Sequence, residues 1–68
     1  MDNKEQEFIR ESILNLLKGQ DKFDIKSILD YLDYVNKVVY KENEIFPILN
    51  KLIVEKKISL NMNLYFLM

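Results

Sequence analysis

The amino-acid sequence predicts a small, mainly α domain of the α+β class, in which three helices are followed by a C-terminal β-hairpin. Apolar residues recur at spacings of three and four along three successive segments, which is typical of amphipathic helices. The chain then alternates apolar and polar residues on the approach to a turn. With 68 residues, 49% of them hydrophobic, there is material for one core, so we expect a single domain over residues 1–68.

The first helix is expected over residues 4–18. Acidic residues crowd its first turns and Lys18 lies in its last turn, an arrangement that the helix dipole favours. Gly19 follows and is expected to supply the left-handed residue that ends many helices. Phe8 and Leu14 lie beside the apolar stripe and are expected to be partly exposed. The stripe itself consists of Ile9, Ile13, Leu16 and Leu17.

A second helix is predicted over residues 25–34. Phe23 precedes it as a short extended anchor, and the Asp24 side chain is placed to cap the free amides of its first turn. The next stretch is ambiguous, because the brief apolar run of residues 38–40 fits a short strand, an extra helical turn or an extended loop. The stripe of the second helix consists of Ile25, Ile28, Leu29 and Leu32.

The third helix is expected to begin at the cap residue Asn43 and to run to residue 56, with Pro47 in about its first turn. Strands are expected at residues 58–61 and 64–67, joined by a turn at residues 62–63. On the third helix, the inward positions are Ile45, Ile48, Leu49 and Leu52, flanked by Phe46 and Ile53. The outward positions are Glu44, Pro47, Asn50, Lys51 and Val54.

Two stretches resemble the winged helix-turn-helix superfamily. Residues 44–58 are similar to its recognition helix and first wing strand, where a leucine-rich helix passes through a basic turn into an isoleucine. Residues 23–29 are similar to its short strand and the entry of its second helix. The resemblance covers nearly the whole chain and indicates no particular subfamily. It implies that the third helix enters the DNA major groove and that the wing reaches the backbone or minor groove.

The charge distribution departs from that pattern. Residues 37–58 carry five lysines and three glutamates, a net charge of +2, whereas the whole chain carries −1 and the wing tip has no cation. Because phosphate contacts dominate affinity for DNA, so few cations predict weak binding by one copy. The alternative is that these lysines only solvate helix ends and that the asparagine has no specific role. The candidate nucleic-acid-binding residues are Lys41, Asn50, Lys51, Lys56 and Lys57.

Composition excludes several classes of protein. With no cysteine and no histidine, the chain has neither a disulfide framework nor thiolate or imidazole chemistry, and one glycine excludes phosphate-cradling loops. Asp30 and Asp33 lie one turn apart without the other ligands that a metal or catalytic site needs. We therefore expect no enzyme, cofactor, metal or small-molecule substrate. The absence of an export signal or a long apolar run predicts a cytoplasmic protein without membrane spans.

Two functions remain. The first is a dimeric DNA-binding transcriptional regulator; the alternative is a protein-protein interaction module, or adaptor, inside a larger assembly.

The four tyrosines are interpreted as core residues rather than as base-stacking platforms. A homodimer is expected through the C-terminal strand with help from the first helix, because a two-stranded wing covers one face only and its last strand is expected at a sheet edge. The candidate dimer residues are Phe8, Leu14, Tyr65 and Leu67.

Overall fold

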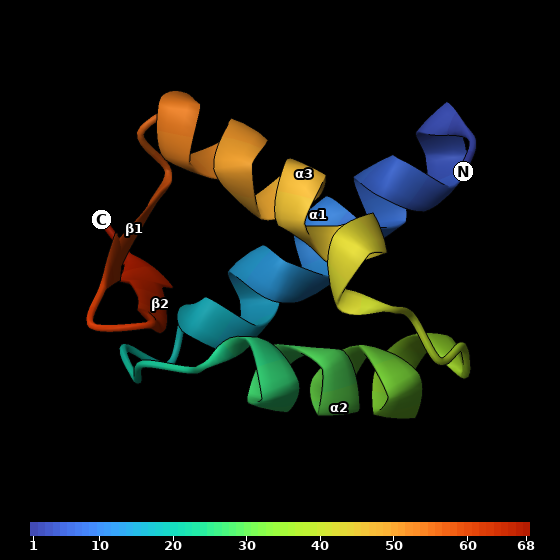
Figure 1. Cartoon of the computed structure of the whole chain (residues 1–68), viewed down its shortest axis with the longest axis horizontal. Coiled ribbons are helices and arrows are strands. Elements are labelled where there is room, and N and C mark those ends of the chain that lie inside the picture. Colours follow the sequence, from blue (N-terminus) through green and yellow to red (C-terminus); the bar gives the residue numbers. More distant parts are fainter.

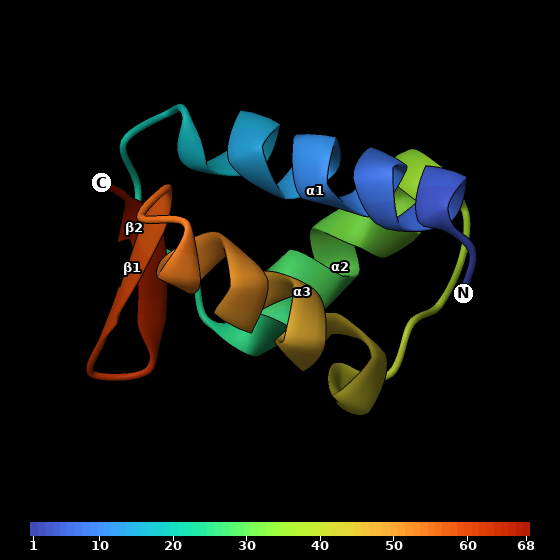
Figure 2. The ribbon, with the colours of Figure 1, turned by 90° about the horizontal axis from the view of Figure 1, so that it is seen from above.

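A computed structural model describes all of residues 1–68 and confirms the predicted class, three helices followed by an antiparallel hairpin (Figure 1). The architecture is winged-helix-like. Figure 2 shows α1 running along one side of the molecule, with the hairpin at one end of the helices. The elements are α1 (Asn3–Leu17), α2 (Ile25–Asn36), α3 (Glu42–Val54), β1 (Ile58–Asn61) and β2 (Leu64–Leu67).

The ends of the first two helices follow from local chemistry. The Asp24 side chain accepts a hydrogen bond from the Ser27 amide at 2.8 Å, which confirms the predicted cap of α2. The expectation for Gly19 was wrong, because the residue with positive φ after α1 is Gln20, at 65°. Helix α2 continues to Asn36, beyond its predicted end, and Lys37 then takes the left-handed conformation with φ 61°.

Helix α3 begins earlier than expected. Its N-cap is Lys41 rather than Asn43, and the Glu44 side chain accepts a hydrogen bond from the Lys41 amide at 2.9 Å. Pro47 therefore lies in the second turn of the helix, and the carbonyl of Asn43 has no amide four residues later to accept from. The ambiguous stretch after α2 is an extended loop, which ends in the buried Tyr40, whose hydroxyl donates to the Glu5 carboxylate at 3.1 Å.

The core lies between the three helices and the inner face of the hairpin. It contains the inward positions expected for α3 and most of those expected for α1 and α2. Fully burying one such aliphatic side chain stabilises the fold by about 1.5–3 kcal/mol, so these stripes hold the helices together. The buried cluster consists of Ile9, Ile13, Leu17, Ile28, Leu32, Tyr40, Ile45, Ile48, Leu49, Leu52, Ile58 and Tyr65.

Strand β2 does not lie at a free sheet edge, contrary to expectation. It pairs with β1 on one side, and Tyr65 pairs with Phe23 on the other. The Phe23 amide donates to the Tyr65 carbonyl at 3.0 Å and the Tyr65 amide donates back at 2.8 Å. The extended anchor predicted at Phe23 is thus present, and it makes β2 the middle strand of three extended segments.

The face of the hairpin that meets the core is also the opposite of the one expected. Tyr65 lies opposite Leu60 in the register and is only 5% exposed, so its face of β2 is the inner face. Strand alternation places Leu64 and Phe66 on the outer face, where both are half-buried. The Lys22 ammonium lies 5.0 Å from the centre of the Phe66 ring and covers part of that face.

The hairpin tip has the predicted position. Met62 and Asn63 both have positive φ, 52° and 65°, which is the geometry of a two-residue turn that matches the twist of the strands. Such a conformation is uncommon for methionine, and the Met62 side chain is 87% exposed. None of the three helices is long and apolar enough to cross a membrane.

Candidate functional site

The predicted nucleic-acid-binding residues are all exposed, but they do not form one surface. Lys41 lies at the start of α3, whereas Lys56 and Lys57 follow its end. A helix of 13 residues is about 20 Å long, so these lysines are separated by the whole length of α3. The cations therefore lie at the two ends of the candidate recognition helix rather than along it.

The outer face of α3 carries no charge. At about 100° per residue, Asn43, Pro47, Asn50 and Val54 lie furthest from the core positions, with Phe46 beside them. Val54 is 79% exposed and Phe46 is 37% exposed. Of the predicted contact residues, only Asn50 lies on this face.

The wing, like the outer face of α3, carries no charged side chain. No residue from 58 to 68 is charged, although charged residues make up 31% of the chain. Leu60 and Met62 are exposed on β1 and at the tip, and α3 packs against β1. We call the uncharged surface of α3 and the wing the neutral face. It consists of Asn43, Phe46, Pro47, Asn50, Val54, Leu60 and Met62.

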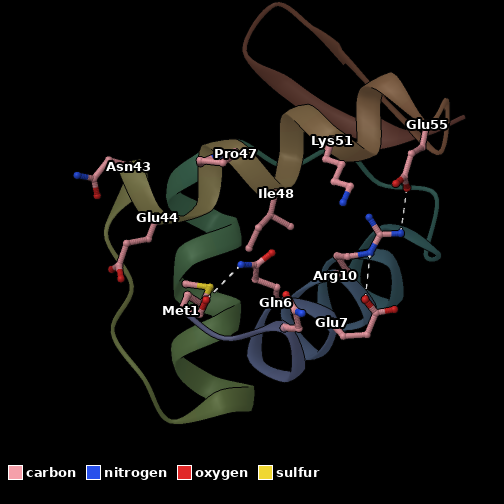
Figure 3. Close-up of a pocket in the computed structure, with 11 residues that line it drawn as sticks. Met1, Gln6, Glu7, Arg10, Asn43, Glu44, Pro47, Ile48, Lys51 and Glu55 are labelled. Carbon is pink, nitrogen blue, oxygen red and sulfur yellow. Dashed lines mark hydrogen bonds and ion pairs between the residues drawn. The ribbon is translucent and has the colours of Figure 1, made fainter.

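Lys51 lies on another side of α3. It lines a groove of about 780 Å³ between the N-terminal half of α1 and α3 (Figure 3). We call this the α1–α3 groove. Its charged lining residues are Glu7 and Arg10 from α1, and Glu44, Lys51 and Glu55 from α3 and its C-terminal cap.

Ion pairs link the two walls of the α1–α3 groove. Arg10 Nη2 donates to Glu55 Oε1 at 2.9 Å, and Arg10 Nε lies 3.7 Å from the Glu7 carboxylate. The hydrogen bond from Arg10 is the main reason why the pKa of Glu55 is lowered; the charges of Lys57 and Lys51 add to it, and desolvation opposes it. Two lysines predicted to contact DNA thus already interact with a carboxylate, which reduces the positive potential they offer to phosphate.

The candidate dimer residues are also dispersed. Tyr65 is buried in the core of its own subunit, so the expectation that it forms part of an interface was wrong. Leu14 is half-buried and packs against the same core. Phe8 is 55% exposed on α1, and Leu67 is 37% exposed on β2. The hairpin lies at the end of the molecule away from the N-terminus (Figure 1).

Phe8 instead lines a local groove, half of it apolar, that the spacing of residues does not predict. This groove has a volume of about 470 Å³, and its apolar lining comes from Phe8, Val35, Val38 and Tyr40. The apolar run before α3 was the available signal. Its position beside α1 depends on how the loop after α2 folds back, which periodicity does not specify.

The remaining residues considered in the sequence are the aspartates of α2 and the tyrosines. Asp30 and Asp33 are both exposed, and no three carboxylates come close enough together to hold a metal ion. Of the tyrosines, Tyr40 and Tyr65 are core residues, and burial raises the pKa of both phenols. Tyr34 does not follow the core interpretation, since it is 76% exposed, with the Lys37 ammonium 5.5 Å from its ring centre.

The surfaces described above are thus a neutral face on α3 and the wing, a charged groove on the α1 side of α3, and a small apolar groove beside Phe8. Comparison with known proteins adds no relative to this description: no family profile, no curated protein and no solved structure matches the chain.

Proposed function

We propose that this chain is a winged helix-turn-helix protein that acts as a protein-protein interaction module and docks a partner on the neutral face. One observation carries the proposal: the outermost side of α3 and the wing strands expose Val54 and Met62, at 79% and 87%, and carry no charged side chain of their own. The three-helix order and the closing hairpin support the superfamily assignment.

The physical argument rests on what each class of partner requires. Binding to DNA releases counterions in proportion to the phosphates that lysine and arginine neutralise, and the neutral face neutralises none. The cores of protein interfaces are depleted of charge and enriched in aromatic residues and methionine. Phe46 and Met62 supply such groups on the neutral face, and no charge has to be desolvated when they are covered.

The test uses one pair of substitutions that moves the two functions in opposite directions. Val54→Lys and Met62→Lys, made together, place two cations on the neutral face. A docked protein partner should be lost, because two charges would be buried without partners. Val39→Lys is the matched control, since Val39 is also 79% exposed but lies in the loop between α2 and α3.

The readout is quantitative mass spectrometry of proteins captured by the tagged chain from nuclease-treated lysate. The proposal requires a protein that wild type and Val39→Lys both recover and that the double variant does not. If all three chains recover the same proteins, or if nothing but nucleic acid is captured, the neutral face is not a docking surface.

The second candidate function is the dimeric DNA-binding transcriptional regulator. Lys56 and Lys57, both exposed at the base of the wing, favour it. A mobility shift on random duplex at low salt tests it: binding should weaken with salt, and changing both lysines to Gln should reduce the salt dependence. The Val54→Lys and Met62→Lys chain should then bind duplex more tightly than wild type. If wild type shows no shift at about ten micromolar, this function is excluded.

A further inference from the structure

The carboxylates of the α1–α3 groove already have partners. Glu7 and Glu55 both pair with Arg10, and Glu44 accepts a hydrogen bond from the Lys41 amide. Acceptor capacity in the groove is thus largely used by the protein itself. A ligand that brought only a positive charge would have to compete with these internal contacts.

Two donors in the same groove have no acceptor. Arg10 Nη1 is buried and makes no hydrogen bond. Lys51 forms no ion pair within 4.0 Å. Figure 3 shows the Lys51 side chain directed from α3 toward the Arg10 guanidinium. Two cationic groups therefore face each other across the groove. The nearby Glu55 carboxylate pairs with Arg10 but makes no ion pair with Lys51, so no carboxylate bridges the two.

This arrangement is costly as it stands. A buried donor without a partner forfeits its solvation, at a cost of about 1–3 kcal/mol in typical proteins, and like charges that face each other repel. An acceptor placed between the two groups removes both costs at once. Arginine and lysine together offer two donor directions, which match the two oxygens of one carboxylate.

We infer that the α1–α3 groove binds the carboxylate of an acidic side chain in a partner protein, between Lys51 Nζ and Arg10 Nη1. Because Nη1 is covered in the unbound protein, side chains of the groove have to shift as the carboxylate enters. A single negative charge suits the site better than phosphate does, because Glu7 and Glu55 lie on either side of Arg10 and repel a dianion. The site borders the neutral face, because Asn43 and Pro47 belong to both surfaces. It does not depend on docking at Val54 and Met62, which do not line the groove.

A peptide is favoured over a free acid by a second feature of the groove. Asn43 and Pro47 also line it, and the Asn43 carbonyl lacks its helical donor because Pro47 has no amide hydrogen. That carbonyl is available to a backbone amide of a bound segment. The groove therefore offers donors for an acidic side chain and, about two helical turns away along α3, an acceptor for the chain that carries it.

The experiment titrates the full chain with blocked glutamate, N-acetyl-glutamate N-methylamide, and with the matching blocked glutamine, at constant ionic strength. Nitrogen-proton NMR follows the Arg10 Nε–H group and the backbone amides of residues 48–51. The glutamate should shift these signals saturably at millimolar concentration, while the glutamine should not. Lys51→Gln should weaken the glutamate affinity about tenfold, and Lys57→Gln, the control outside the groove, should leave it unchanged.

Three results would overturn the inference. They are an absence of saturation with glutamate, equal responses to glutamate and glutamine, and unchanged affinity in the Lys51→Gln chain. Inorganic phosphate binding more tightly than the glutamate would also overturn it, because it would assign the groove to phosphate. The Val54→Lys and Met62→Lys chain should keep the glutamate response, which separates failure of this site from failure of the proposed function.

Discussion

The two sides of α3 differ sharply in charge. On the side toward α1, Arg10 pairs with Glu55 and Lys51 extends into a charged groove. The outer side, with Asn50 and Val54, carries no charge and makes no contact with the rest of the chain that would bury it. Residues 37–58, whose net charge is +2, therefore do not form one basic surface. What a partner meets depends on which side of the helix each lysine occupies and on the carboxylates beside it.

The largest expected effect separates the inner face of the wing from the neutral face. Tyr65→Ala should lower the free energy of unfolding by about 3 kcal/mol, because it removes a buried ring from the core. Val54→Ala, on the neutral face, should change it by about 0.5 kcal/mol or less. Chemical denaturation of both variants measures the difference. Equal losses would mean that the neutral face is packed against something in the isolated chain.

A smaller effect is expected on the α1 side. Arg10→Met should destabilise the fold by about 1 kcal/mol, since it breaks a partly exposed ion pair while keeping most of the packing of the side-chain stem. Lys51→Gln should not destabilise the fold and should raise its stability slightly, because Lys51 makes no ion pair and faces the like charge of Arg10 (Figure 3). If Lys51→Gln lowered the free energy of unfolding as much as Arg10→Met does, Lys51 would make a stabilising contact that the structure does not show.

At the wing tip, stability and binding should change in opposite directions. Met62 has a φ of 52°, a conformation that asparagine tolerates better than methionine. Met62→Asn should therefore raise the melting temperature, with a gain of about 0.5 kcal/mol, and should weaken capture of a partner that covers the neutral face. A variant that is more stable and still binds fully would remove Met62 from the docking surface.

The smallest effect is expected in the pH dependence of stability, at acid pH. The folded-state pKa of Glu55 lies below its ordinary value of 4.5, so the carboxylate stabilises the fold above that pH, and this contribution is lost as the pH falls through the folded-state pKa. Melting temperatures of wild type and Glu55→Gln should differ by a constant amount from neutral pH to about pH 5 and converge below pH 4.5. Parallel curves throughout would contradict the contribution of Glu55.

The sequence predicts the elements that depend on neighbouring residues. The stripe of α2, its Asp24 cap and the turn at Met62 and Asn63 each rest on contacts within a few residues. The start of α3 was misplaced because Lys41, not Asn43, is the N-cap, and the Glu44 side chain accepts a hydrogen bond from the Lys41 amide.

The errors in the candidate sites have a common physical cause. Alternation along β2 shows that Tyr65 and Leu67 share a face, but it does not show which face meets the core. That choice follows from the pairing of Tyr65 with Phe23, which joins distant parts of the chain. Likewise, the unpartnered Arg10 nitrogen becomes visible only when α1 and α3 are packed together.

The Phe23–Tyr65 bridge also determines how the wing moves. Each amide is bonded to the other residue's carbonyl, so neither can exchange its hydrogen with solvent unless the hairpin separates from the segment between α1 and α2. We expect these two amides to exchange at nearly the rate set by global unfolding, far more slowly than the amides at the hairpin tip. A wing fixed in this way would meet the partner proposed for the neutral face already ordered, so little conformational entropy would be lost on binding.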